Sequence, residues 1–441
     1  MNYIDFGSRC RSALNPVIET LKKTGFFHIF GSGTLVQLVG FLSSIIVVRI
    51  VTKDEYGLFT YAANIYSIVM IISGLGSSET MLQIASENFR NEQKKRLIYQ
   101  FALTFGIVAN AVFSLIVVIV GFVYPFGVSG AQVLILMYAF LPVLQYLNAY
   151  QTMYLRVERR NREYSFVNLL FSVLQLIFSV IGALAFGPQG FILAQYASVV
   201  VIVAVAIKLY DIPLSFGLRQ YPKNERREFI KYCLIISVGN GFSQLKSLVS
   251  AFILGVLIPN AAIIASYNVA IKIPTALLFI PSAICVYLYP HFAEHIDDGS
   301  WCLRNFFRSM VGVFCINLIV SVVAVLLAEP LIVIAFGSEY QDSVGVFIIM
   351  VVNYLIAGTF NTLPGNLLAA QRKFSFNLIV NIATGIMSIV LNIAFIMVVG
   401  GAEGAALAVL ASSVLSGCCY TFGLISVYKR KVSARPSQRA H

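Results

Sequence analysis

Residues 377–399 have the sequence NLIVNIATGIMSIVLNIAFIMVV, an apolar run of 23 residues without a charged side chain. A helix needs about 20 such residues to cross the hydrocarbon core of a membrane. Runs of this kind recur along the 441-residue chain, which is 59% hydrophobic and only 11% charged, and its mean hydropathy is +0.84. Because this excess is spread over the whole length, it does not come from one anchor or signal segment. The sequence predicts an all-α polytopic membrane protein.

Apolar runs bounded by charged residues or by glycine and proline give twelve candidate transmembrane helices. They lie near residues 26–51, 56–82, 100–123, 132–154, 166–186, 191–210, 232–258, 263–289, 309–328, 344–370, 377–399 and 404–427.

The basic residues are distributed very unevenly between the two sides of this arrangement. Of the 31 Lys and Arg residues, 27 fall in the loops and termini of one side, and only Arg49 and Lys53 fall on the other. The remaining two, Lys246 and Lys272, lie inside spans. Basic residues favour the cytoplasmic side, so both termini are predicted to be cytoplasmic. The outward loops are short, which leaves no room for an extracytoplasmic domain.

A weak internal repeat divides the chain into two parallel halves. Tyr61 matches Tyr267 at an offset of 206, and residues 162–166 match residues 372–376 at an offset of 210. The predicted organisation is therefore two six-helix lobes around a central cavity, with these boundaries: a basic cytoplasmic segment 1–25, an N-terminal lobe 26–210, a cytoplasmic linker 211–231, a C-terminal lobe 232–428 and a basic cytoplasmic tail 429–441.

Polar and charged side chains inside the spans are the candidate site residues. Arg49, Lys246 and Lys272 are the candidates for substrate binding, because a cation within the bilayer is costly and should face water or an anion. Glu79 is a candidate for ion coupling, and the polar residues that share these helices are candidates for lining the cavity, namely Gln37, Asn240, Ser243, Gln244 and Asn268. Cations with almost no buried carboxylates favour an anionic cargo such as a phosphate or pyrophosphate.

Each candidate also has an ordinary structural explanation. Small residues on these helix faces can simply permit close packing. Lys246 can hydrogen bond within its own helix, Arg49 can extend to the membrane interface, and Glu79 can be an interfacial carboxylate. These alternatives stay open at the level of the sequence.

The chain lacks the usual signatures of an enzyme or a metalloprotein. It has no Gly-rich phosphate loop, no nucleophile elbow and no C-x-x-C pair among its seven cysteines. The pattern from His291 to His295 resembles that of a zinc peptidase, but a solvated helix end accounts for it. We therefore expect no catalytic residues, metal, cofactor, ATP or nucleic acid.

Three groups of residues resemble those of the polysaccharide transporter family within the multidrug/oligosaccharidyl-lipid/polysaccharide flippase superfamily. They are residues 49–59 (RIVTKDEYGLF), residues 288–290 (LYP), and residues 328–330 (AEP) followed by Phe336, Gly337 and Tyr340. The chain is most similar in character to Wzx-type flippases of O-antigen or capsule repeat units.

This resemblance implies a specific function. It implies two lobes that open alternately to each side of the bacterial inner membrane, and a cargo of undecaprenyl pyrophosphate carrying an oligosaccharide, moved from the inner to the outer leaflet. Implied partners are this lipid-linked oligosaccharide, membrane lipid and other polysaccharide assembly proteins. A multidrug/cation antiporter of the same superfamily is the main alternative, and a membrane polysaccharide polymerase is a more distant one.

Overall fold

The computed structural model describes residues 26–71, 73–124, 126–218 and 220–434, and over these ranges it contains helices and no strands. The predicted segment 1–25 and the last residues of the predicted tail, 435–441, lie outside this description. Eight of the described helical stretches are long and apolar enough to span a membrane, and a ninth is a pair, Ala131–Met137 and Leu141–Val157, bent by 41°. The protein is thus an all-α, multi-pass membrane protein.

The chain separates into two compact units. Unit 1 comprises residues up to Ile50 together with Ile72–Tyr124 and Val133–Ser237. Its helices are α2 (Phe26–Ile50), η1 (Ser73–Gly76), α4 (Ser77–Glu87), α5 (Glu92–Val123), α6 (Ala131–Met137), α7 (Leu141–Val157), α8 (Asn161–Tyr210) and the first part of α9 (Lys223–Leu257).

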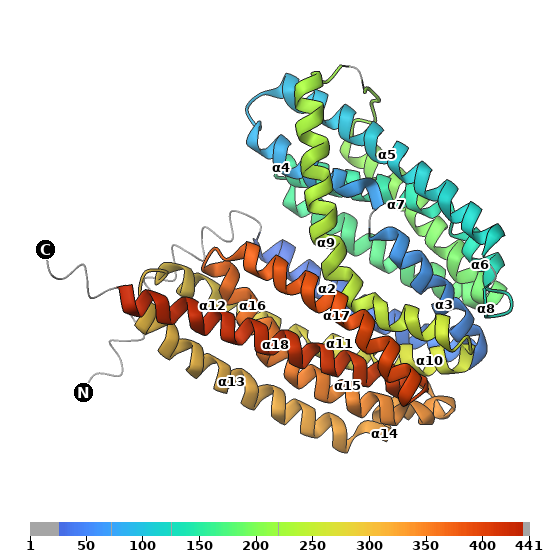
Figure 1. Ribbon diagram of the computed structural model, residues 1–441. Coiled ribbons are helices and arrows are strands. Elements are labelled where there is room, and N and C mark those ends of the chain that lie inside the picture. The colour runs from blue at the N-terminus through green and yellow to red at the C-terminus, as the bar shows by residue number, and fades with distance from the viewer. Residues whose placement is uncertain (1–25, 72, 125, 219, 435–441) are drawn as a thin grey trace, which may run out of the picture. The chain divides into compact units, whose positions relative to one another are not determined.

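Unit 2 comprises Val51–Ile71, Pro125–Gln132 and the chain from Val238 onward. It holds α3 (Lys53–Met70), the end of α9, α10 (Ala261–Ala270), α11 (Lys272–Leu277), α12 (Phe279–Glu294), α13 (Gly299–Leu326), α14 (Ala328–Phe336), η2 (Ser338–Ser343), α15 (Val344–Ile356), the π-helix η3 (Ala357–Thr362), α16 (Leu363–Ala370), α17 (Phe374–Val398) and α18 (Gly401–Ala434). In this unit α13, α15, α17 and α18 lie side by side (Figure 1).

The fifth and sixth predicted spans are the two halves of α8. Gly187 interrupts this helix with φ 56° and ψ −136°, and Pro188 follows it. A Cβ on Gly182 would lie 2.3 Å from the carbonyl oxygen of Gly190, so the two halves fold back on each other. Both glycines allow the close backbone approach on which membrane helices depend.

Besides the predicted span 132–154, which is the bent pair α6 and α7, two more predicted spans are broken rather than continuous. The predicted span 56–82 consists of α3 and α4, separated by η1, where Gly74, Leu75 and Gly76 have φ of 58°, 48° and 72°. The backbone N–H of Gly74 donates to Oδ1 of buried Asn110, 3.2 Å away. The predicted span 263–289 consists of α10, α11 and α12, with short breaks at Ile271 and Leu278. Proline lacks the backbone N–H that continues a helix, and Pro274 and Pro281 follow these breaks by three residues each.

The two sequence halves share one unusual turn. Arg159 and Arg372 have a left-handed backbone conformation, with φ of 57° and 59°, and lie just before α8 and α17. In both turns the residue after the arginine donates to a carbonyl five positions earlier, in the pairs Arg160 to Leu155 and Lys373 to Leu368. Arg159 and Arg372 are 213 positions apart. The sequence match of residues 162–166 with residues 372–376 has an offset of 210, so the two correspondences differ by three residues.

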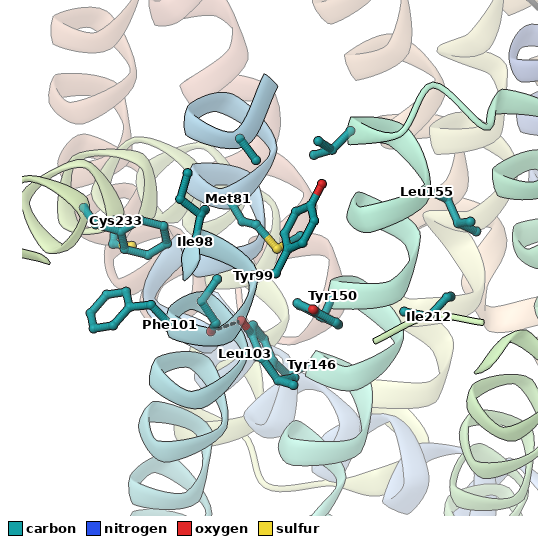
Figure 2. Packing of buried hydrophobic residues seen from close by; sticks show 14 of the residues in the cluster. Met81, Ile98, Tyr99, Phe101, Leu103, Tyr146, Tyr150, Leu155, Ile212 and Cys233 are labelled. Atoms are coloured by element: carbon teal, nitrogen blue, oxygen red, sulfur yellow. Dashed lines mark hydrogen bonds between the residues drawn. The ribbon is translucent and has the colours of Figure 1, made fainter. Parts of the chain in front are cut away.

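Unit 1 is organised around a buried aromatic core between α4, α5, α7 and α9 (Figure 2). The hydroxyl of Tyr146 donates to the carbonyl of Ala102 at 2.6 Å and lies 3.0 Å from Oγ of Ser77. These contacts offset the cost of burying the hydroxyl in an apolar interior, and they fix the position of the Tyr146 ring.

Candidate functional site

Lys272 is the predicted site residue that the structure describes most fully. It is the first residue of α11, directly after the break at Ile271, and is half-buried within the membrane-length stretch Ala261–Glu294. Its Nζ lies 5.7 Å from the centre of the Tyr56 ring. Over the described ranges of the chain, no carboxylate forms an ion pair with Lys272. Lys272 therefore stays a candidate for binding an anionic ligand.

Two buried tyrosines form the wall beside this lysine. Tyr56 of α3 is 2% exposed and Tyr340 of η2 is 1% exposed. Their rings meet edge to face, with centres 6.5 Å apart. Nζ of Lys53 lies 5.5 Å from the Tyr340 ring, so each ring faces one cation. Such contacts are each worth about 0.5–2 kcal/mol, depending on exposure.

Lys53, unlike Lys272, is neutralised. Its Nζ lies 2.6 and 2.7 Å from the two carboxylate oxygens of Asp342 and donates to the carbonyl of Glu339 at 3.0 Å. The hydroxyl of Ser266 also donates to Asp342, at 2.9 Å. Asp342 is thus already occupied by Lys53 and Ser266. The cluster, defined as Lys53, Tyr56, Ser266, Lys272, Tyr340 and Asp342, carries one excess positive charge.

Glycines bring α3 close enough to α10 to form this cluster. A Cβ on Gly57 would lie 1.9 Å from the carbonyl oxygen of Ala261, and one on Gly255 would lie 2.7 Å from the Tyr61 ring. The contact at Gly57 is with backbone, so this position requires glycine, whereas at Gly255 of α9 the Tyr61 ring would have to shift. The resulting backbone contact holds Tyr56 against the helices that carry Lys272.

The remaining predicted residues are placed in different surroundings. Asn268, one turn before Lys272, is half-buried and donates to the carbonyl of Ile264 at 2.8 Å. Glu79 is half-buried in the first turn of α4 in unit 1, where it accepts from Oγ of Ser78 at 2.9 Å. Gln37 and Arg49 of α2 and Gln244 of α9 are exposed. The side chains of Asn240, Ser243 and Lys246 lie outside the described residues.

The sequence did not identify most of the cluster. Tyr56 and Tyr340 belong to motifs that carried the family resemblance, and this was the available signal for them. Asp342 and Ser266 gave no signal in the sequence, because their roles depend on contacts between distant segments. Asp342 lies 289 positions from Lys53 and 76 positions from Ser266.

A sequence profile described as "Polysaccharide biosynthesis protein" matches residues 46–345. The chain belongs to this family. No curated protein sequence matches it significantly.

Solved transporter structures share the fold. The chain is similar to the lipid II flippase MurJ in an inward closed conformation, with a TM-score of 0.67, 14% identity, and coverage of 91% of this chain and 89% of that one. It is also similar to an inward-facing multidrug resistance MATE transporter of the MOP superfamily, with a TM-score of 0.65, 15% identity, and coverage of 90% and 95%. A third similar structure is a MOP superfamily transporter from Pyrococcus furiosus, with a TM-score of 0.57, 16% identity, and coverage of 92% and 94%.

Family membership and shared fold together establish a polytopic protein of polysaccharide biosynthesis with the architecture of flippases and transporters. The cluster in unit 2 adds a chemical feature within this architecture. It combines an unneutralised cation, two aromatic rings and a broken helix in a membrane span, and broken helices of this kind mark binding sites in transporters.

Proposed function

We propose that the protein is a flippase for undecaprenyl-pyrophosphate-linked oligosaccharides, the repeat units of O-antigen, capsule or exopolysaccharide. The observation that carries the proposal is Lys272, a half-buried cation in a membrane span without a carboxylate partner among the described residues. Such a charge is tolerated where an anionic ligand or water meets it. The pyrophosphate group of the lipid-linked sugar is such a ligand, and the family description supports a role in polysaccharide biosynthesis.

The mechanism that we propose is alternating access. The contact of α3 with α10 and η2 joins a helix from the first sequence half to helices from the second, and we propose that it closes the outer side. Opening separates Lys53 from Asp342 and Tyr56 from Tyr340, which exposes Lys272 to the outer face. The lipid chain stays in the bilayer while the head group crosses.

Electrostatics favours the outward direction. Moving a negative charge outward across an inside-negative membrane releases about 2.3 kcal/mol per charge per 100 mV. The membrane potential therefore favours outward movement of a pyrophosphate head group. The orientation used here, with both termini in the cytoplasm of a bacterial inner membrane, rests on the distribution of Lys and Arg.

A multidrug/cation antiporter is the second candidate, and Glu79 is the observation in its favour. A half-buried carboxylate inside a helix suits a cationic cargo or a coupling ion, and several similar structures are multidrug transporters. The excess positive charge around Lys272 argues against this candidate. An enzyme such as a polymerase has less support, because the similar structures are transporters.

Deletion and complementation test the proposal. The deletion strain receives wild type, Lys272→Gln, Lys272→Arg, Lys246→Ala or, as a control for loss of an exposed lysine, Lys223→Ala. Surface polysaccharide and the lipid-linked repeat unit on the inner leaflet are measured together. We expect wild type, Lys272→Arg and Lys223→Ala to restore surface polymer, and Lys272→Gln to leave the inner pool high.

The opposite results separate the candidates. If deletion changes neither quantity but sensitises cells to cationic drugs, the flippase proposal fails and the antiporter replaces it. If deletion abolishes surface polymer but Lys272→Gln restores it fully at equal expression, the function stands and the role of Lys272 fails.

A further inference from the structure

A basic pocket lies at one end of unit 1, apart from the cluster around Lys272. It has a volume of about 460 Å³ and is lined by the last turn of α4, the α4–α5 turn and one residue of the α7–α8 turn: Ser86, Glu87, Asn88, Phe89, Arg90, Asn91 and Arg159. The α4–α5 and α7–α8 turns are among those that the distribution of Lys and Arg places on the cytoplasmic side. We propose that this pocket binds the phosphate group of an anionic membrane lipid.

The arginines of the pocket retain their charge for a ligand. Over the described part of the chain, neither Arg90 nor Arg159 makes an ion pair. The neighbouring carboxylates are bound elsewhere, since Glu92 and Glu158 both pair with buried Lys95, at 2.9 Å each. Glu87, the one acid in the lining, accepts from Gln83 at 3.3 Å.

Local structure fixes the position of Arg159. Its guanidinium carbon lies 4.3 Å from the centre of the Phe89 ring, and Nζ of Lys95 lies 4.8 Å from the same centre. The left-handed turn, with φ 57° at Arg159, directs the chain away from α7 at this point. A guanidinium held by an aromatic ring is pre-organised for the bidentate binding of a phosphate.

The start of α5 lies beside the pocket. Asn91 caps this helix by accepting from the N–H of Lys94 at 3.0 Å, so that N–H is already paired. A helix start also carries a partial positive charge that favours anions. The two arginines thus supply the charged donors that a phosphate requires, and the charge of the helix start adds to their attraction.

The location favours lipid over soluble phosphate. α5 and α8 begin at Glu92 and Asn161 and are long and apolar enough to span a membrane, and the pocket lies at these starts of the two helices, the side that the distribution of Lys and Arg assigns to the cytoplasm. Basic pockets at the cytoplasmic interface are characteristic binding sites for anionic head groups. This inference does not depend on the transported substrate.

Binding to the purified full-length protein in detergent tests the proposal. The probes are fluorescent phosphatidylglycerol, neutral phosphatidylcholine with the same label, and inorganic phosphate as a competitor. The variants are wild type, the double variant Arg90→Gln with Arg159→Gln, and the double variant Arg90→Lys with Arg159→Lys. The control is Arg304→Gln with Arg308→Gln, which removes two exposed charges from α13.

We expect the Gln pair to weaken phosphatidylglycerol binding about tenfold. The Lys pair, which keeps the charge but loses the bidentate geometry, should fall between wild type and the Gln pair. The α13 control should stay within about twofold of wild type, and phosphatidylcholine binding should not change. If millimolar inorganic phosphate displaces phosphatidylglycerol, the natural ligand of the pocket is free phosphate, and the assignment to lipid is overturned. Thermal unfolding curves would first verify that both proteins are folded. Equal affinity of wild type and the Gln pair for phosphatidylglycerol would then refute the site itself.

Discussion

Lys53 and Asp342 lie 289 positions apart in the sequence and form an ion pair with an Nζ–Oδ2 distance of 2.6 Å. The pair joins the start of α3 to η2, and the same aspartate accepts from Ser266 of α10. One carboxylate therefore connects three elements of unit 2. If this contact closes the outer side of the transporter, breaking it should shift the protein toward the open state.

Asp342→Asn and Lys53→Gln should each increase the exposure of the α3–α10 contact. The pair is partly exposed, with 57% exposure at Asp342, so its contribution is about 0.5–1 kcal/mol and the shift in population about two- to fivefold. The measurement is the rate at which a membrane-impermeant thiol reagent labels Ala265→Cys, a buried position of α10, with the native cysteines replaced. The double variant should label no faster than the single ones. Strictly additive effects would show that the two residues act independently.

Gly57→Ala should destabilise the protein, because the added methyl group would lie 1.9 Å from the carbonyl oxygen of Ala261. Overpacking of this kind costs about 1–3 kcal/mol. Gly312→Ala in α13 is the matched control, since nothing lies within 4 Å of the added atom, and alanine is the better helix former by about 0.5–1 kcal/mol. Thermal unfolding in one detergent should therefore shift downward for Gly57→Ala and slightly upward for Gly312→Ala. Equal midpoints for the two variants would contradict the close contact of α3 with α10.

Two adjacent lysines of α5 should respond very differently to removal. Lys95 is 1% exposed and pairs with Glu92 and Glu158. Lys95→Ala leaves the partly buried Glu158 with only the hydrogen bond from Tyr99 and should cost about 2 kcal/mol. Lys94 pairs with Glu225 at 3.1 Å, and both side chains are about one-third exposed. Lys94→Ala should cost less than about 1 kcal/mol. Thermal unfolding of the two variants checks the contrast, and similar losses of stability would show that the Lys95 pairs contribute little.

Tyr56 should act through its ring rather than its hydroxyl. The cation of Lys272 faces the centre of this ring, and phenylalanine preserves that interaction. Tyr56→Phe should keep surface polysaccharide near the wild-type level in the complementation assay, while Tyr56→Ala should reduce it severalfold. Loss of export in Tyr56→Phe would instead assign the function to the hydroxyl.

The sequence predicted the fold class, because helix-length hydropathy is a local signal. It also singled out Lys272, a member of the candidate cluster in unit 2, because an intramembrane charge is a local signal too. It also placed the boundary near Gly187 that divides α8. It did not predict the breaks at Leu75 and Ile271, since a broken span has the same composition as a continuous one. Asp342 was missed for a different reason: it lies in η2, a short segment of ordinary polarity, and its partners are defined only by tertiary contact.

The turn at Gly187 also bears on how the protein enters the membrane during synthesis. The chain carries no charged residue from position 164 to position 207, so the tip of the α8 hairpin presents no charge that would have to cross the hydrocarbon. The close contact of Gly182 with Gly190 lets the two halves associate as soon as the tip has formed. The insertion machinery can therefore release residues 161–210 as a preassembled pair, and a charge introduced at Phe186 or Gln189 should slow this step of biogenesis without altering the finished transporter's interior.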